Sequence, residues 1–231
     1  AVGFETTAPA VAVAARFARA RKLENFSLLV SHVRVPPALE AIAGASDSRV
    51  QAFLAAGHVC TVMGTAEYEA IPRRHGIPIV ATGFEPVDIL EGVARAVALL
   101  EAGEAGVDIQ YRRAVRPEGN PAARALLEEV FEVADRPWRG IGVVPEGGLV
   151  LRGPYRALDA AAAFAELVPA ERPREPAACR AGDVLRGVIR PPECAEFGRG
   201  CRPEHPLGAP MVSAEGACAA YWRHRAAETC P

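Results

Sequence analysis

Four of the six cysteines stand apart from one another in the last quarter of the chain: Cys179, Cys194, Cys201 and Cys218. Cysteine thiolates bind zinc and iron–sulfur clusters. Structural zinc sites usually draw their ligands from close pairs, and no two of these cysteines form a CxxC pair. Single cysteines from separate loops suit the four irons of a [4Fe–4S] cluster better. The spacing therefore favours a [4Fe–4S] cluster, with zinc or no metal as the alternatives.

A second set of candidate residues follows short apolar segments that we predict to be strands: Glu5, Thr6, Thr7, His58, Cys60 and Glu85. In open α/β sheets, ligands bind beyond the carboxyl ends of the strands. We therefore expect four strand ends of one sheet, including the one at His32, to face a single crevice. Plainer roles are open for Thr7, as a helix cap, and for Cys60, as a small buried hydrophobe. Asp88 is expected to cap the helix after Glu85.

Two further residues lie close to the cysteines in the sequence. Glu215 precedes Cys218 by three residues, in a segment with little periodicity, and is a candidate for tuning or protonating the site. The plainer alternative is a fixed loop around the metal. Cys230 is a possible substitute ligand, but it is the next-to-last residue, and chain ends are often frayed.

The first two thirds of the chain alternate between two kinds of segment that must position these residues. Apolar runs predict strands over 25–31, 50–54 and 77–81. Helical periodicity predicts helices over 88–102 and 121–134, and Asn120 is a suitable N-cap for the second. This alternation is typical of an α/β domain with a mainly parallel sheet flanked by helices.

A domain boundary is predicted near residue 150, at the end of a hairpin over 138–151 whose turn we place at 145–148. Residues 1–150 would form the α/β lobe. Residues 151–231 would form a smaller domain that is loop-rich and contains five of the six cysteines. A short segment with little regular structure often needs a staple, and metal is the natural one where cysteines stay reduced.

Charge and hydropathy exclude several classes of protein. The net charge is −2, so we expect no non-specific binding to nucleic acid or to anionic membranes. No apolar run approaches the ~20 residues that cross a bilayer. We therefore expect a cytoplasmic protein. The chain opens without Met on what resembles the end of a strand, which predicts an incomplete chain.

Seven stretches of the chain resemble the hydrogenase maturation family HypD. They are GFETTAP (3–9), NFSLLVSHVRVPPA (25–38), GHVCTVMG (57–64), IPIVATGFEPVDIL (77–90), YRRAVRPEGNPAA (111–123), WRGIGVVPEGGL (138–149) and EHPLGAPMVSAEGACAAY (204–221). They are distributed along nearly the whole chain, from residue 3 to residue 221.

The resemblance implies a role in assembling the Fe(CN)2CO unit of [NiFe]-hydrogenases. HypD-like proteins hold the iron together with a small partner, HypC, while HypE and HypF supply cyanide. The resemblance also implies that the four cysteines hold a [4Fe–4S] cluster that donates electrons. Such a protein is an assembly scaffold with a redox role rather than a conventional turnover enzyme. The alternative is an interaction domain stapled by zinc or by a structural cluster, without a redox role.

The chain departs from the HypD pattern at one point. The family carries a CGxHxH motif and a GPGCPVC motif in its N-terminal region, and neither occurs in this sequence. The resemblance implies that these motifs supply the main iron ligand and a redox pair. We therefore expect the chain to contain an α/β lobe and a cluster domain, and not to assemble the cofactor alone.

Overall fold

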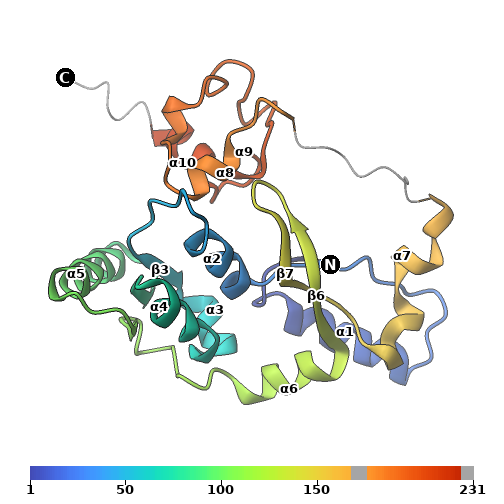
Figure 1. Ribbon diagram of the computed structural model, residues 1–231. Helices are drawn as coiled ribbons and strands as arrows, with labels where there is room; N and C mark the ends of the chain where they lie inside the picture. Colours follow the sequence, from blue (N-terminus) through green and yellow to red (C-terminus); the bar gives the residue numbers. More distant parts are fainter. Residues whose placement is uncertain (168–175, 225–231) are drawn as a thin grey trace. The chain divides into compact units, whose positions relative to one another are not determined.

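The computed structural model describes residues 1–167 and 176–224 (Figure 1). These residues belong to two compact units. The first combines Ala1–Glu40, Gln51–Arg136 and Val144–Pro169, and the second combines Ala41–Val50, Pro137–Val143 and Ala170–Pro231. The sequence placed a single boundary near residue 150. In the structure, two short segments from the first two thirds of the chain, Ala41–Val50 and Pro137–Val143, belong instead to the same unit as the C-terminal residues.

A three-stranded parallel sheet forms one part of the first unit. Its strands are β3 (Phe53–Ala56), β4 (Ile79–Thr82) and β5 (Val107–Ile109), in the order β3-β4-β5. Every residue of the central strand is buried. The helices α3 (Gly57–Met63) and α5 (Pro86–Ala102) contact it, and η1 (Ala66–Tyr68) and α4 (Ala70–His75) follow α3. The prediction of a parallel sheet flanked by helices is confirmed.

Two further strands, β1 (Val2–Gly3) and β2 (Ser31–His32), pair in parallel in a sheet of their own. Our expectation of four strand ends in one sheet was therefore wrong. Of the predicted strand over 25–31, only Ser31 lies in a strand, which is β2. Short strands with few apolar neighbours have no sequence pattern that determines their partner. Their pairing is determined by the tertiary structure.

The main apolar core of the first unit lies between α1 (Ala8–Ala20) and α6 (Pro121–Val130). The buried face of α1 consists of small side chains: Ala8, Ala12, Ala15 and Ala18. Alanine at this spacing lets a second helix approach closely, and Leu127 and Val130 of α6 join the same cluster. Asn120 caps α6 as predicted, accepting hydrogen bonds from the N–H groups of Ala122 and Ala123 at 3.1 Å each.

The hairpin exists, but its turn is not where we predicted it. The strands β6 (Phe131–Trp138) and β7 (Gly142–Leu151) form a two-stranded sheet, and residues 139–141 connect them. Gly140 has a φ of +86°, which suits glycine in such a turn. Residues 145–148 lie inside β7, where Gly147 accepts a hydrogen bond from the N–H of Arg34. Because β6 begins at Phe131, α6 ends earlier than the predicted residue 134.

The helix α5 ends at Gly103 as predicted, but its large apolar side chains do not face the core. Val87, Leu90, Val93, Val97 and Leu100 are exposed, while Asp88, Gly92 and Ala96 are buried. A Cβ on Gly92 would lie 2.2 Å from Thr82 of β4. The close approach of helix to sheet therefore selects the face with small residues. Asp88 is not the N-cap, since Glu85 occupies that position.

The remaining elements are short. In the first unit, η2 (Gly153–Leu158), α7 (Ala160–Ala163) and η3 (Ala165–Leu167) follow β7. The helix α2 (Val35–Ala43) follows β2 and begins in the same unit. In the second unit, α8 (Ala181–Leu185), η4 (Pro191–Glu193), α9 (Ala209–Val212) and α10 (Ala217–His224) are joined by loops. The loop-rich C-terminal region is thus as predicted. Within the described residues, no helix is both long and apolar enough to cross a membrane.

Candidate metal centre

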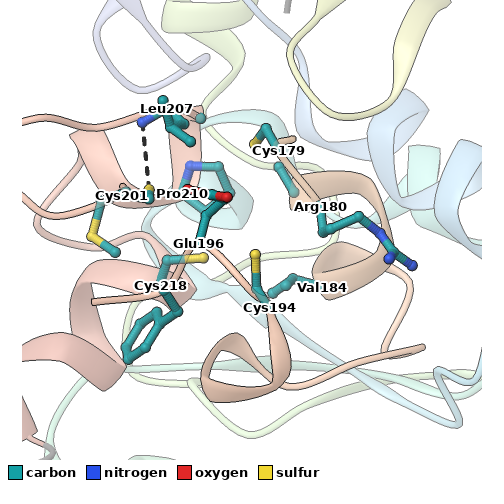
Figure 2. A pocket seen from close by; sticks show the side chains of 13 residues that line it. Cys179, Arg180, Val184, Cys194, Glu196, Cys201, Leu207, Pro210 and Cys218 are labelled. Carbon is teal, nitrogen blue, oxygen red and sulfur yellow. Dashed lines mark hydrogen bonds between the residues drawn. The ribbon is translucent and has the colours of Figure 1, made fainter. Parts of the chain in front are cut away.

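The four widely spaced cysteines line one pocket in the second unit (Figure 2). The empty space in this pocket, the four-cysteine pocket, is about 350 Å³. Cys179 precedes α8, Cys194 follows η4, Cys201 lies in a loop and Cys218 is in the first turn of α10. None of the five described cysteines forms a disulfide. Four separate segments therefore bring four thiols to one place.

Local structure explains how two of these cysteines are held. The carboxylate of Glu193 accepts a hydrogen bond of 2.7 Å from the N–H of Arg190 and closes the short turn before Cys194. The N–H of Cys201 donates to the carbonyl of Glu196 at 2.9 Å, and Gly198, with a φ of +76°, forms the tight loop between them. Each cysteine is thus fixed by its own turn rather than by a long helix or strand.

The walls of the four-cysteine pocket are mostly apolar. They include Ala181, Val184, Leu207, Pro210 and Met211. Burial, followed by the charges of the nearby Cys201, Cys194 and Cys179, raises the pKa of the Cys218 thiol to about 11. Because each thiolate disfavours ionisation of the next, a bound cation would be needed to hold all four in the ionised form.

Two contacts at the sulfurs bear on the kind of centre that the pocket could hold. The N–H of Leu207 donates a hydrogen bond of 3.4 Å to Sγ of Cys201. A Cβ on Gly208 would lie 2.3 Å from Sγ of Cys179, so only glycine lets the backbone pass this close. Backbone amides near cysteine sulfurs are a regular feature of iron–sulfur sites. The four donors, the apolar walls and these contacts fit such a group.

A single metal ion fits the same residues less well. Around one zinc ion, tetrahedral sulfurs at about 2.3 Å from the metal would lie about 3.8 Å from one another. Within residues 1–167 and 176–224, no three His, Cys, Asp or Glu side chains are placed to hold one ion.

Of the two residues named near the cysteines in the sequence, Glu215 does not line the pocket. Glu215 is exposed, and its N–H donates to the hydroxyl of Ser213 at 3.2 Å. Cys230 lies outside the described residues. The pocket does include Glu196 and Phe197, which we did not predict. The sequence feature that could have indicated both residues is their position between Cys194 and Cys201.

The candidate residues that follow the predicted strands are divided between the two parallel sheets of the first unit. His58 follows β3 and Glu85 follows β4, and both are exposed at the carboxyl end of the three-stranded sheet. The ring of His58 lies 4.9 Å from that of the exposed Phe84. Thr6 and Thr7 instead follow β1.

Thr7 stands at the N-cap position of α1 without making the side-chain cap that we considered. Its hydroxyl donates to the carbonyl of Phe4 at 3.0 Å instead. The same hydroxyl lies 3.4 Å from Nδ1 of the buried His32. Thr7 therefore links the end of β1 to the end of β2 rather than capping the helix.

Glu5 and Cys60 are buried, with exposed fractions of 1% and 0%. Oε1 of Glu5 accepts a hydrogen bond of 2.8 Å from the N–H of Val35, the first residue of α2. Oε2 has no partner among the described residues. Burial raises the pKa of Glu5 to about 7 and that of Cys60 to about 11, the latter helped by the charge of Glu5. Cys60 is therefore a protonated, unreactive thiol at neutral pH.

A network that we did not predict joins the ends of β4 and β5. Asp88 accepts hydrogen bonds from both Nη atoms of Arg113 at 2.7 and 2.5 Å, and from Nε2 of Gln110 at 2.9 Å. The hydrogen bonds from Arg113, followed by that from Gln110, lower the pKa of Asp88 to about 2. The ring of Tyr111 packs where a Cβ on Gly57 or Gly83 would stand. This network holds the carboxyl edge of the sheet in place.

Comparison with known proteins decides the family. The family model HypD, described as "Hydrogenase formation hypA family", matches residues 1–225. The chain belongs to the HypD family. It is 41% identical to the hydrogenase maturation factor HypD2 of Bradyrhizobium diazoefficiens over 97% of this chain. It is 41% identical to HypD of Rhodobacter capsulatus over 98% of the chain, and 40% identical to HypD of Escherichia coli over 99%.

The alignments to these HypD relatives cover only part of each relative. They span 60% of the Bradyrhizobium protein, 62% of the Rhodobacter protein and 61% of the Escherichia protein. The resemblance drawn from the seven sequence stretches is thus confirmed for the family. These HypD relatives are longer than this chain, so their activities as whole proteins are not assigned to it directly.

Proposed function

We propose that the chain acts in the maturation of [NiFe]-hydrogenases, as a scaffold and electron donor for assembly of the Fe(CN)2CO unit. The names of its relatives support a role in this process, since each is called a hydrogenase maturation factor. HypC is the proposed partner that shares the iron, and HypE and HypF are the proposed sources of cyanide. The observation that carries the redox part is the convergence of four cysteines on one pocket.

Cys179, Cys194, Cys201 and Cys218 are the proposed ligands of a [4Fe–4S] cluster. When bound, such a cluster supplies one-electron transfer. The residues around it have separate tasks. The N–H of Leu207 withdraws charge from Sγ of Cys201, and the apolar walls limit water around the sulfurs. Because the cysteines must stay reduced before they bind metal, we propose a cytoplasmic location.

The scaffold part of the proposal rests on the strand ends of the first unit. The iron with its cyanide and CO ligands is the cargo, and it needs few specific pockets. His58 and Glu85 are exposed at the end of the three-stranded sheet, where a proton donor and an acceptor would meet a ligand. Glu5 is proposed to act through α2, since its carboxyl binds the first N–H of that helix.

Anaerobic purification followed by metal and sulfide analysis tests the redox part. We expect a brown protein that absorbs broadly near 400 nm, with about four irons and four sulfides per chain. A colourless protein with one zinc would support the alternative, an interaction domain with a structural metal and no redox role. That result would overturn the proposed electron donation and leave the family unaffected.

Replacing one proposed ligand gives the first prediction. Cys201→Ser is expected to remove most of the bound iron and the absorbance near 400 nm, because a hydroxyl is a poor substitute for a thiolate ligand. Cys60→Ser is the matched control, since Cys60 is buried in the first unit and does not line the four-cysteine pocket. Equal iron content in the two variants would show that Cys201 is not a ligand.

A further inference from the structure

A second cavity lies directly beside the four-cysteine pocket. This cavity, the outer pocket, spans about 560 Å³ of space that includes open solvent, and its lining includes Arg139, Cys179, Pro206 and Gly208. Cys179, Ala181, Leu207 and Gly208 line both cavities. Cys194, Cys201 and Cys218 do not line the outer pocket. A molecule in the outer pocket would therefore meet the proposed cluster at its Cys179 corner.

The wall between the two cavities is thin at one point. Gly208 has no side chain, and its missing Cβ would lie only 2.3 Å from Sγ of Cys179. The backbone of Gly208 therefore touches the sulfur, with no side chain between them. Electrons pass most readily across short, bonded or contacting paths, and this wall provides one.

The charge of the outer pocket is set by Arg139. Among the described residues, no acidic side chain lines the cavity. The Arg139 side chain makes no hydrogen bond or ion pair with any described residue, whereas Arg180, Arg186, Arg190 and Arg202 of the same unit do. A guanidinium without a partner at a cavity attracts a carboxylate, a phosphate or another oxyanion.

The position of Arg139 is determined by the turn that carries it. It stands in the connection between β6 and β7, next to Gly140. A Cβ on Gly140 would lie 3.1 Å from Cβ of Ala181 and 3.2 Å from the nitrogen of Gly182. The turn thus packs directly on the start of α8, two residues after Cys179. Arg139 is held close to a proposed cluster ligand.

We infer that the outer pocket binds a small anionic reductant, held by Arg139, which donates electrons to the cluster at Cys179. The inference rests on the proposed function, because it requires the cluster. A reductant held by Arg139 would give up one electron, which a cluster held by the four cysteines would accept at its Cys179 side. No covalent bond forms or breaks, and the oxidised donor leaves the pocket.

Stopped-flow reduction of the cluster-loaded protein tests this inference. Dithionite is the anionic probe and the reduced methyl viologen cation is the second probe, and loss of absorbance near 400 nm reports the rate. Arg139→Glu is expected to slow reduction by dithionite at least about threefold, because the favourable charge is reversed. The same variant should leave the methyl viologen rate unchanged or increase it. Salt should reduce the dithionite rate of the unmodified protein more than that of the variant.

Two matched variants keep the test specific. Arg199→Glu makes the same charge change at an exposed arginine of the second unit that lines neither cavity, and it should not alter the dithionite rate. Arg139→Lys should retain most of the rate, and Arg139→Gln replaces Arg139→Glu if the latter holds no cluster. Equal dithionite rates in the Arg139 and Arg199 variants would overturn the inference. A protein without any cluster would instead contradict the proposed function itself.

Discussion

At the scale of single residues, burial decides what the candidate side chains can do. Glu5 and Cys60 have side chains typical of proton transfer and nucleophilic chemistry, but both are shielded from water. A buried carboxyl resists ionisation because the charged form loses its hydration. Glu5 therefore remains largely protonated up to about pH 7, at a place where its Oε1 holds the first turn of α2. A buried acid of this kind makes stability depend on pH.

The pH dependence of Glu5 gives a prediction. Its folded-state pKa is about 7, above the ordinary value of 4.5. The folded protein thus binds the proton more tightly than the unfolded chain does. The stability gained is complete below about pH 4.5 and is lost as the pH rises to about 7. Relative to Glu5→Gln, the unfolding free energy should fall by up to about 3 kcal/mol across this window.

Urea unfolding at closely spaced pH values measures this effect. Differences between the unmodified protein and Glu5→Gln cancel the titration of all other groups. Glu104→Gln, at an exposed position, is the control and should follow the unmodified protein at every pH. If Glu5→Gln also follows it, the carboxyl of Glu5 does not titrate near neutrality.

At the scale of elements, packing selects which face of a helix is buried. Periodicity located α5 and its end at Gly103 correctly. It did not determine the buried face, because Gly92 allows a closer approach to β4 than any large side chain would. The same applies to β7, whose Pro-Glu-Gly-Gly segment looks like a turn but continues the strand. Local composition identifies elements more reliably than it identifies their neighbours.

The exposed face of α5 can be tested by truncation. Leu90→Ala should change the unfolding free energy by less than about 0.5 kcal/mol, because the side chain is 70% exposed. Leu127→Ala, in the core between α1 and α6, should cost about 2–5 kcal/mol. Urea denaturation of the two variants at one pH provides the comparison. Similar losses would mean that Leu90 is covered in solution.

At the scale of the whole molecule, regular structure is unevenly distributed. The first unit contains both parallel sheets and the α1–α6 core. The second has a small apolar cluster around Cys201, Met211 and Ala219, and its helices within the described residues have at most eight residues. So little buried apolar surface contributes little stability. A metal centre would therefore contribute much of the stability of the second unit.

Removal of the metal should consequently affect the two units differently. Anaerobic chelation of iron is expected to increase amide hydrogen exchange in residues 191–218, because the loops lose their common anchor. The amides of β4 should keep their protection, since every residue of that strand is buried in the first unit. Hydrogen exchange followed by mass spectrometry resolves the two regions. Unchanged exchange in 191–218 would show that these loops are stable without metal.

The sequence by itself determined the parts of this protein that depend on local chemistry. The α/β alternation and the cap at Asn120 follow from residue types at short spacing. The HypD resemblance was also visible in contiguous stretches, and the family comparison confirms it. Each of these signals is carried by neighbouring residues and needs no knowledge of distant contacts.

Only the tertiary structure decided which distant residues meet. It placed the four cysteines around one pocket, left Glu215 outside it and brought Arg139 of the β6–β7 turn beside Cys179. It also buried Glu5 and divided the strand ends between two sheets. These outcomes depend on backbone approach at glycines such as Gly92 and Gly208, and on strands of two to four residues. Contacts of this kind depend on the whole fold, so no short stretch of sequence specifies them.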